Sequence, residues 1–176
     1  MYDRGQGVPQ DYKEAVKWYR SAAGQGLADA QFYVGSMYDQ GHGVPQDDKE
    51  AARWYRLAAD QGSAAAQFNL GLTYYYGHGV PEDYKEAVKW YRAAAGQGLA
   101  AAQIDLGRMY DKGQGLPQDY IQAHMWFNLA AANGSANTSA DAVKNRDIVS
   151  RKMTPDQIAE AQRLAREWKP KTSMPR

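Results

Sequence analysis

The sequence predicts an all-α protein, an α-solenoid of antiparallel helix pairs with a 36-residue repeat and a C-terminal capping helix pair. Three observations predict this fold. Tryptophan recurs every 36 residues, at Trp18, Trp54, Trp90 and Trp126. Glycine, proline and aspartate recur with the same step, which marks tandem copies of one unit. Within each copy, small and aromatic residues follow the i, i+3, i+4, i+7 spacing of an amphipathic helix.

The helix that we call helix B carries the most regular apolar stripe, which in the first copy includes Trp18 and Tyr19. Asp11 followed by Glu14 predicts a capping box at its start, in which each side chain binds a free backbone N–H of the first turn. Gly26 predicts its end. The same start signal recurs at Asp47 and Glu50, Asp83 and Glu86, and Asp119 and Gln122.

A second helix, helix A, is predicted between each Gly26-type residue and the next turn. In its first full copy Ala30, Val34 and Tyr38 share one side, and Gly35 allows a close approach of another backbone. The run from Gly41 to Pro45 then predicts a tight turn, because glycine accepts positive φ and proline fixes the following conformation.

The full motif, A-x-x-x-[LV]-G-x-x-Y-x-x-G-x-G-[VL]-P-x-D-x-x-x-A-x-x-W-[YF]-x-x-A-A-x-x-G, resembles the SEL-1-like repeat family, a relative of the tetratricopeptide repeats. The resemblance covers four tandem repeats in residues 1–135. It implies a right-handed solenoid that acts as an adaptor or scaffold for protein complexes. By the same resemblance we expect a bacterial protein, periplasmic or secreted, although no signal segment is present in this sequence.

The two ends are expected to differ from the middle. The first repeat lacks most of helix A, because Tyr2 already matches its last aromatic position, so one face of the first helix B is expected to lack cover. Either the chain is a fragment of a longer protein, or Val16, Tyr19 and Ala23 are covered by a second copy in a homodimer.

At the other end, residues 136–168 are predicted to form the capping helices, and residues 169–176 a flexible tail. Thr154 to Gln157 predict a capping box with proline at the first helical position. Met125 and Asn128 stand where earlier repeats carry Lys or Arg, which predicts a different neighbour for the fourth helix B.

Composition argues against several classes of function. A net charge of +1 gives no overall field that would attract nucleic acid. Nothing approaches the roughly 18 consecutive apolar residues of a spanning helix, so no membrane insertion is expected. The absence of cysteine excludes a disulfide framework and a cysteine nucleophile.

Catalytic motifs are also missing. The sequence holds no H-E-x-x-H, Walker loop, G-x-S-x-G or S-x-x-K, so we expect no enzyme, no metal and no cofactor; a hydrolase is the alternative that no motif supports. His42 and His78 lie one repeat apart in the turn, but Gln6 and Gln114 hold the same place, which favours a solvated turn over a metal site.

Partner binding is expected where helix A varies between copies while the core stays fixed. The variable positions follow helical spacing, and by resemblance to related repeats they face a concave groove. Tyrosine and arginine among them are frequent hot-spot residues. The predicted groove residues are Tyr33, Ser36, Gln40, Asn69, Leu72, Tyr75, Tyr76, Asp105, Arg108 and Lys112. The alternative is that these positions vary because they lie on ordinary surface that is under no selection for binding.

The function predicted from the sequence is therefore a non-catalytic interaction scaffold that binds a peptide or protein segment in the helix A groove. The alternative is a structural module that assembles into dimers or fibres through its exposed terminal helix faces.

Overall fold

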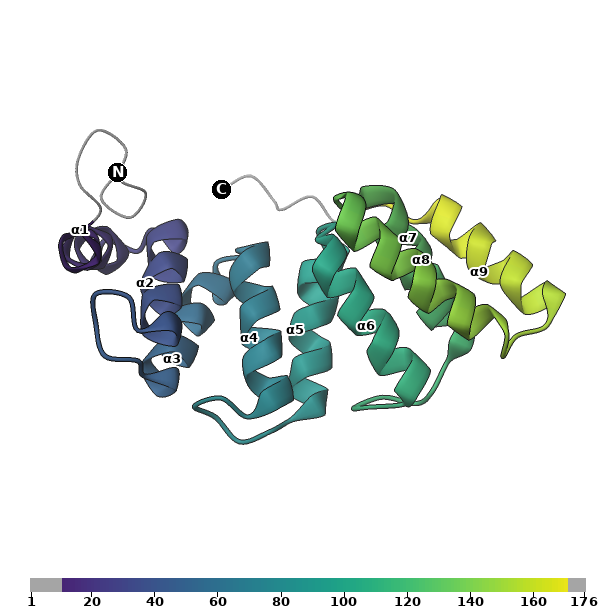
Figure 1. Cartoon of the computed structure of the whole chain (residues 1–176), viewed down its shortest axis with the longest axis horizontal. Helices are drawn as coiled ribbons and strands as arrows, with labels where there is room; N and C mark the ends of the chain where they lie inside the picture. Colours follow the sequence, from purple (N-terminus) through teal and green to yellow (C-terminus); the bar gives the residue numbers. More distant parts are fainter. Residues whose placement is uncertain (1–10, 171–176) are drawn as a thin grey trace. The chain divides into compact units, whose positions relative to one another are not determined.

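The computed structural model describes residues 11–170, which form α-helices and turns and contain no strand (Figure 1). This confirms the all-α prediction. The helices are α1 (Tyr12–Gly24), α2 (Ala28–Gln40), α3 (Asp48–Asp60), α4 (Ala64–Tyr76), α5 (Tyr84–Gly96), α6 (Ala100–Lys112), α7 (Tyr120–Asn133), α8 (Ala136–Ser150) and α9 (Pro155–Glu167). The predictions for Tyr2, Gln6 and the last part of the tail, residues 171–176, lie outside the described residues.

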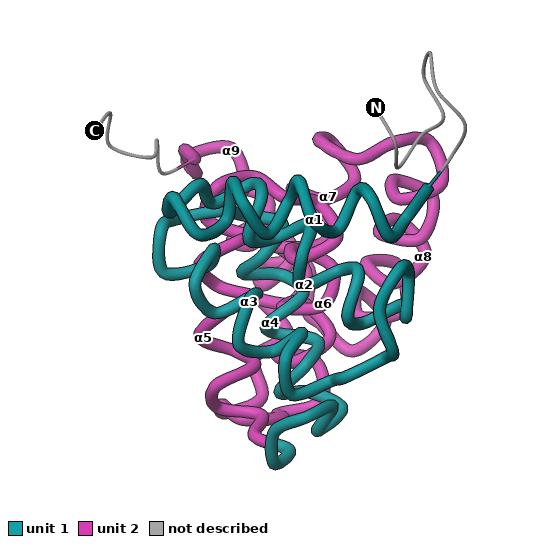
Figure 2. Tube along the Cα trace, turned by 90° about the vertical axis from the view of Figure 1, so that its left-hand side faces the viewer, with its two compact units in different colours: residues 1–82 teal, residues 83–176 magenta. Residues whose placement is uncertain are grey.

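The chain divides into two compact units, residues 1–82 and residues 83–176 (Figure 2). In unit 1, α2 packs against both α1 and α3, and α3 packs against α4. In unit 2, α6 packs against α5 and α7, and α7 also contacts α8 and α9. Helices α2, α4 and α6 are copies of helix A, and α1, α3, α5 and α7 are copies of helix B.

Aspartate caps the start of each helix B, but the predicted capping box is only half formed there. Asp11 accepts hydrogen bonds from the backbone N–H of Lys13 and Glu14, at 2.9 and 3.1 Å. The Glu14 side chain pairs with Lys17 at 2.9 Å instead of returning to the cap, since a cation lies one turn away on the same face. A complete box forms in α9, where Thr154 and Gln157 bind each other's backbone N–H.

The turn after helix A holds neighbouring copies together through its glycines. Gly41 and Gly43 adopt φ of 69° and 74°, as predicted for this turn. A Cβ on Gly43 would lie 2.3 Å from the carbonyl oxygen of Tyr12, at the start of the preceding helix B. Gly79 approaches Asp48, and Gly115 approaches Tyr84, in the same way. The turn therefore packs backbone against backbone, which explains why glycine recurs there.

Glycine within helix A makes room for an aromatic ring of the following helix B. A Cβ on Gly35 would lie 2.7 Å from Cδ1 of Tyr55, and one on Gly107 would lie 2.7 Å from Cε1 of Phe127. Both rings are almost fully buried. A close approach at Gly35 was predicted for a backbone; the nearest atoms are those of the Tyr55 ring, and the carbonyl oxygen of Ala51 follows at 3.3 Å.

A buried glutamine near the start of each helix A fastens it to the preceding helix B. The side-chain amide of Gln31 donates to the carbonyl oxygen of Ala23 at 3.3 Å, and Gln67 repeats the bond to Ala59 at 3.1 Å. Gln103 bonds Ala95 at 3.2 Å. These carbonyls are in the last turn of helix B, where each also accepts a hydrogen bond from the backbone N–H of the glycine three residues later, as Ala23 does from Gly26 at 3.0 Å. The sequence analysis overlooked this glutamine, although it recurs every 36 residues.

The C-terminal helices cover α7, as predicted. Trp168, which directly follows α9, meets Trp126 edge to face, with ring centroids 6.2 Å apart, and Met125 of α7 is buried. In earlier repeats a helix B arginine donates to a helix A tyrosine, as Arg92 does to Tyr110 at 2.8 Å. In the cap the arginine lies on the other helix of the pair. Arg146 of α8 donates to Asn128 of α7 at 3.5 Å.

The prediction that Val16, Tyr19 and Ala23 lack cover within the chain was wrong. Val16 and Ala23 are buried, because α2 and the turn after it cover them, and Tyr19 is half-buried. The exposed side chain is Trp18, at 62%. Its counterpart Trp54 packs against the cluster formed by α1 and α2, so this tryptophan faces the preceding helix pair. Trp18 lies on α1, before which the described residues contain no helix.

Candidate functional site

The predicted groove residues of α2 and α4 converge on one buried phenol in unit 1. The Tyr55 hydroxyl of α3 donates to Asp39 at 3.4 Å and lies near the side chains of Ser36 and Asn69. Burial raises the pKa of Tyr55 well above its ordinary value, and the nearby Asp39 carboxylate raises it further, while Ser36 and Asn69 lower it. The phenol therefore stays neutral and links a residue of α4 to two residues of α2.

Aromatic rings of α2 and α4 contact neighbouring rings. Tyr33 of α2 stacks on Tyr19, with centroids 4.9 Å apart, and meets Phe32 edge to face at 5.5 Å. At the end of α4, Tyr76 meets Tyr75 edge to face at 4.9 Å and stacks on His78 at 5.6 Å. The rings are held in place by one another, so a partner would meet a preorganised surface.

We define the α2–α4 surface as the helix A positions of unit 1 that were predicted to bind. Tyr76 is exposed by 59%, Gln40 is also exposed, and the other members are half-buried. Its residues are Tyr33, Ser36, Gln40, Asn69, Leu72, Tyr75 and Tyr76. Half-buried tyrosine and leucine beside polar groups is a composition typical of protein interfaces.

In unit 2 the predicted residues form a charged cluster instead. Arg108 donates to Asp105 at 2.8 Å and to Asp141 of α8 at 2.6 Å. Burial raises the pKa of Asp105, whereas the Arg108 guanidinium opposes that rise and the negative charge of Asp141 adds to it. Lys112 is exposed at the end of α6. The Arg108 charge is thus already engaged within the chain.

Another ion pair flanks this cluster. Lys152, after α8, binds Asp111 at 2.7 Å and lies 5.1 Å from the centroid of the Tyr120 ring. The hydrogen bond to Asp111 raises the pKa of Lys152. These contacts join α6 and α7 to the chain that follows α8.

Two residues of these sites were missed in the sequence. Tyr55 was treated as part of the apolar core, yet its hydroxyl also donates a hydrogen bond to Asp39 of α2. Asp141 was assigned only to the cap, although it lies one repeat after Asp105 and would have been found by extending the 36-residue step. The cap therefore keeps one groove position of the repeats.

The side chains of the two sites offer hydrogen bonds, ion pairs and aromatic contacts. Among residues 11–170 no group of three or more His, Asp or Glu side chains is arranged to hold a metal ion. His42 stacks on Tyr12 with centroids 4.5 Å apart. No helix in the described part of the chain combines the length and apolar character needed to cross a bilayer.

The profile of the Sel1 repeat matches four consecutive segments of the chain, residues 1–27, 28–63, 64–99 and 100–135. These limits place one helix A and one helix B in each of the last three segments. No curated protein matches the chain.

Solved structures that are similar to this chain include two bacterial proteins. A protective antigen present in uropathogenic Escherichia coli strains, described as displaying an SLR fold, is 39% identical with a TM-score of 0.86. The similarity covers 95% of this chain and 35% of the antigen, so the chain spans about a third of that protein. A Sel1 repeat protein from Oxalobacter formigenes is 32% identical with a TM-score of 0.74, over 96% of this chain and 81% of that one.

Proposed function

Because the chain belongs to the Sel1 repeat family, whose members generally mediate protein–protein interactions, we propose that it is a scaffold that binds a peptide or protein segment on the α2–α4 surface. The family is typically non-catalytic, and the proposed role needs no catalytic group. The partner is expected to contact helix A side chains, while helix B and the turns hold the repeats together.

The main observation that supports this proposal is the exposure of the Tyr76 side chain. A side chain of this size in a stacked, ordered setting offers a large contact area at a low entropic cost. It is among the few large hydrophobic side chains that are exposed in the described residues. Leu72 and Tyr33 extend the apolar area, and Ser36, Asn69 and Gln40 supply hydrogen-bonding groups beside it.

A double variant of the two exposed members, Gln40→Ala with Tyr76→Ala, tests the proposal and leaves the buried residues unchanged, although it removes the ring contacts of Tyr76 to Tyr75 and His78. We expect it to lose the native partner in quantitative capture from the source cell, with circular dichroism and melting unchanged. The control, Arg53→Ala with Leu57→Ala, alters exposed side chains of α3, a helix B. Equal capture by both variants would refute the proposed surface.

Self-association is a second candidate, and the exposure of Trp18 favours it. An indole that is packed in the next repeat and open here offers apolar area to a second copy. Sedimentation velocity across a concentration series should then show a dimer that Trp18→Ser abolishes. A monomer at every concentration would reject this candidate.

A further inference from the structure

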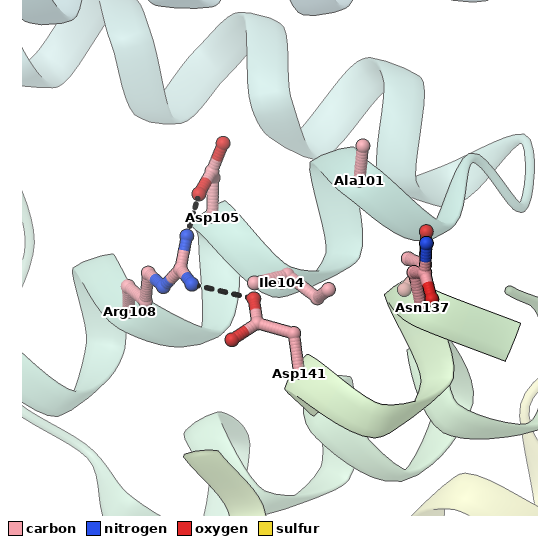
Figure 3. A pocket seen from close by; sticks show the side chains of 7 residues that line it. Ala101, Ile104, Asp105, Arg108, Asn137 and Asp141 are labelled. Atoms are coloured by element: carbon pink, nitrogen blue, oxygen red, sulfur yellow. Dashed lines mark hydrogen bonds and ion pairs between the residues drawn. The ribbon is translucent and has the colours of Figure 1, made fainter. Parts of the chain in front are cut away.

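A separate cavity lies in unit 2 between α6 and α8 (Figure 3). Its volume is about 320 Å³, within the range of small-ligand sites. Ala101 and Ile104 supply an apolar part of the lining, and Asn137 and Thr138 come from the first turn of α8. The charged part consists of Asp105, Arg108 and Asp141 (Figure 3).

Two carboxylates and one guanidinium line the cavity, and the ion pairs of 2.8 and 2.6 Å hold the guanidinium between the carboxylates. Arg108 is therefore already used, and Lys112, at the end of α6, is a second cation that acts on Asp105. An anionic ligand would have to displace Asp105 or Asp141 from Arg108 and would meet both carboxylates.

Asp105 also keeps unused hydrogen-bonding capacity. Its Oδ1 accepts from Arg108, whereas its Oδ2 accepts no hydrogen bond from the side chains described. Figure 3 shows this second oxygen pointing away from Arg108. Asp141 differs, because Asn145 donates to its Oδ1 at 3.1 Å while Arg108 binds its Oδ2. Partial burial without a second donor disfavours the charged form of Asp105, which agrees with its raised pKa.

We infer that this cavity receives a basic side chain, arginine or lysine, from a segment of the bound partner. The aliphatic stem would lie along Ala101 and Ile104, and the cationic head would donate to Oδ2 of Asp105 and approach Asp141. This inference rests on the proposed function, since it assigns a partner chemistry, but it concerns other residues than the α2–α4 surface.

The test uses N-acetyl-arginine amide as the probe and the full chain labelled with ¹⁵N. Titration should shift the backbone amide signals of residues 101–108 and 137–141. N-acetyl-citrulline amide has nearly the same shape without the charge, so it should leave these signals in place. Because a charge-assisted hydrogen bond is lost, Asp105→Asn should weaken binding of the arginine probe about tenfold.

Asn at position 105 still accepts a bond from Arg108, so the variant is expected to fold. Asp141→Asn gives an independent second variant, and Asp60→Asn, on the exposed end of α3, is the matched control that should bind as the parent does. Equal shifts with arginine and citrulline probes, or shifts elsewhere in the chain, would overturn the inference. The probe test does not involve Tyr76, so its failure is distinguishable from failure of the α2–α4 surface.

Discussion

The side-chain amide of Gln61 donates a hydrogen bond to the side-chain carbonyl of Gln31 across 2.7 Å, and the pair two repeats later lacks this bond. There the corresponding residues are Asn133 and Gln103. The Oε1 atom of Gln103 is buried and has no hydrogen-bond partner among the described residues. Asparagine is one methylene shorter than glutamine, which explains the missing bond.

Asn133→Gln should therefore stabilise the protein. A restored bond to a buried acceptor contributes about 1 kcal/mol to the free energy of unfolding. Urea denaturation measures the change, and Asn137→Gln, an exposed substitution of the same kind, should leave stability unaltered. If both variants unfold at the same urea concentration as the parent, the unmet acceptor at Gln103 has no energetic consequence.

Gly107→Ala should destabilise the protein by about 1–3 kcal/mol, because the new Cβ would meet the buried Phe127 ring at 2.7 Å. Helix propensity alone predicts the opposite sign, since alanine is favoured over glycine by about 1 kcal/mol. Gly24→Ala is the control, because its Cβ would meet no atom within 4 Å. A stabilised Gly107→Ala variant would show that α6 and α7 are less closely packed at Gly107 and Phe127 than the structure indicates.

His124 should make stability fall at mildly acidic pH. Burial lowers the pKa of its imidazole below 6.5, Arg146 lowers it further, and Asp147 partly opposes both. The unfolded chain therefore binds a proton at a higher pH than the folded chain, so stability is complete above about pH 6.5 and is lost as pH falls through the folded pKa.

Comparing the free energy of unfolding at pH 8 and pH 5 tests this dependence. His124→Gln should lose less stability between these pH values than the parent, whereas His78→Gln, at an exposed turn, should lose as much. Identical pH dependence in the parent and His124→Gln would contradict a buried neutral histidine.

The repeated tryptophans should contribute unequally to the free energy of unfolding. Trp90 is 6% exposed and Trp18 62%. Trp90→Ala should cost about 3–5 kcal/mol, the usual range for a buried tryptophan, and Trp18→Ala much less. Thermal melting of dilute protein checks the difference. A large loss for Trp18→Ala would mean that its indole is packed in solution.

The helix pairs, their caps and the glycine turns could be predicted from the sequence because each depends on local signals repeated every 36 residues. The Asp11 carboxylate caps backbone N–H groups two and three residues further on, and Gly41 adopts a positive φ, so both roles follow from the local sequence. The partner of Glu14 could not be read in this way, because Lys17 and the backbone N–H of the cap compete for the same carboxylate.

The candidate sites were less predictable, because they depend on contacts between repeats. The residue type at the position of Arg108 differs between repeats, which is typical of a binding position. In the structure, however, the Arg108 side chain is paired with Asp141 of α8. Tyr55 resembles any core aromatic until the positions of Ser36, Asp39 and Asn69 are known. Trp18 follows the repeat consensus, so its exposure of 62% could not be predicted from the sequence pattern.

Photo-crosslinking at a single position tests the proposed binding surface most directly. A benzophenone amino acid replaces Tyr76, on the α2–α4 surface, or Leu57, an exposed residue of α3. Irradiation in the source cell should give one adduct of defined mass at Tyr76 and none at Leu57. An adduct at Leu57 alone, or the same adducts at both positions, would contradict partner binding through helix A.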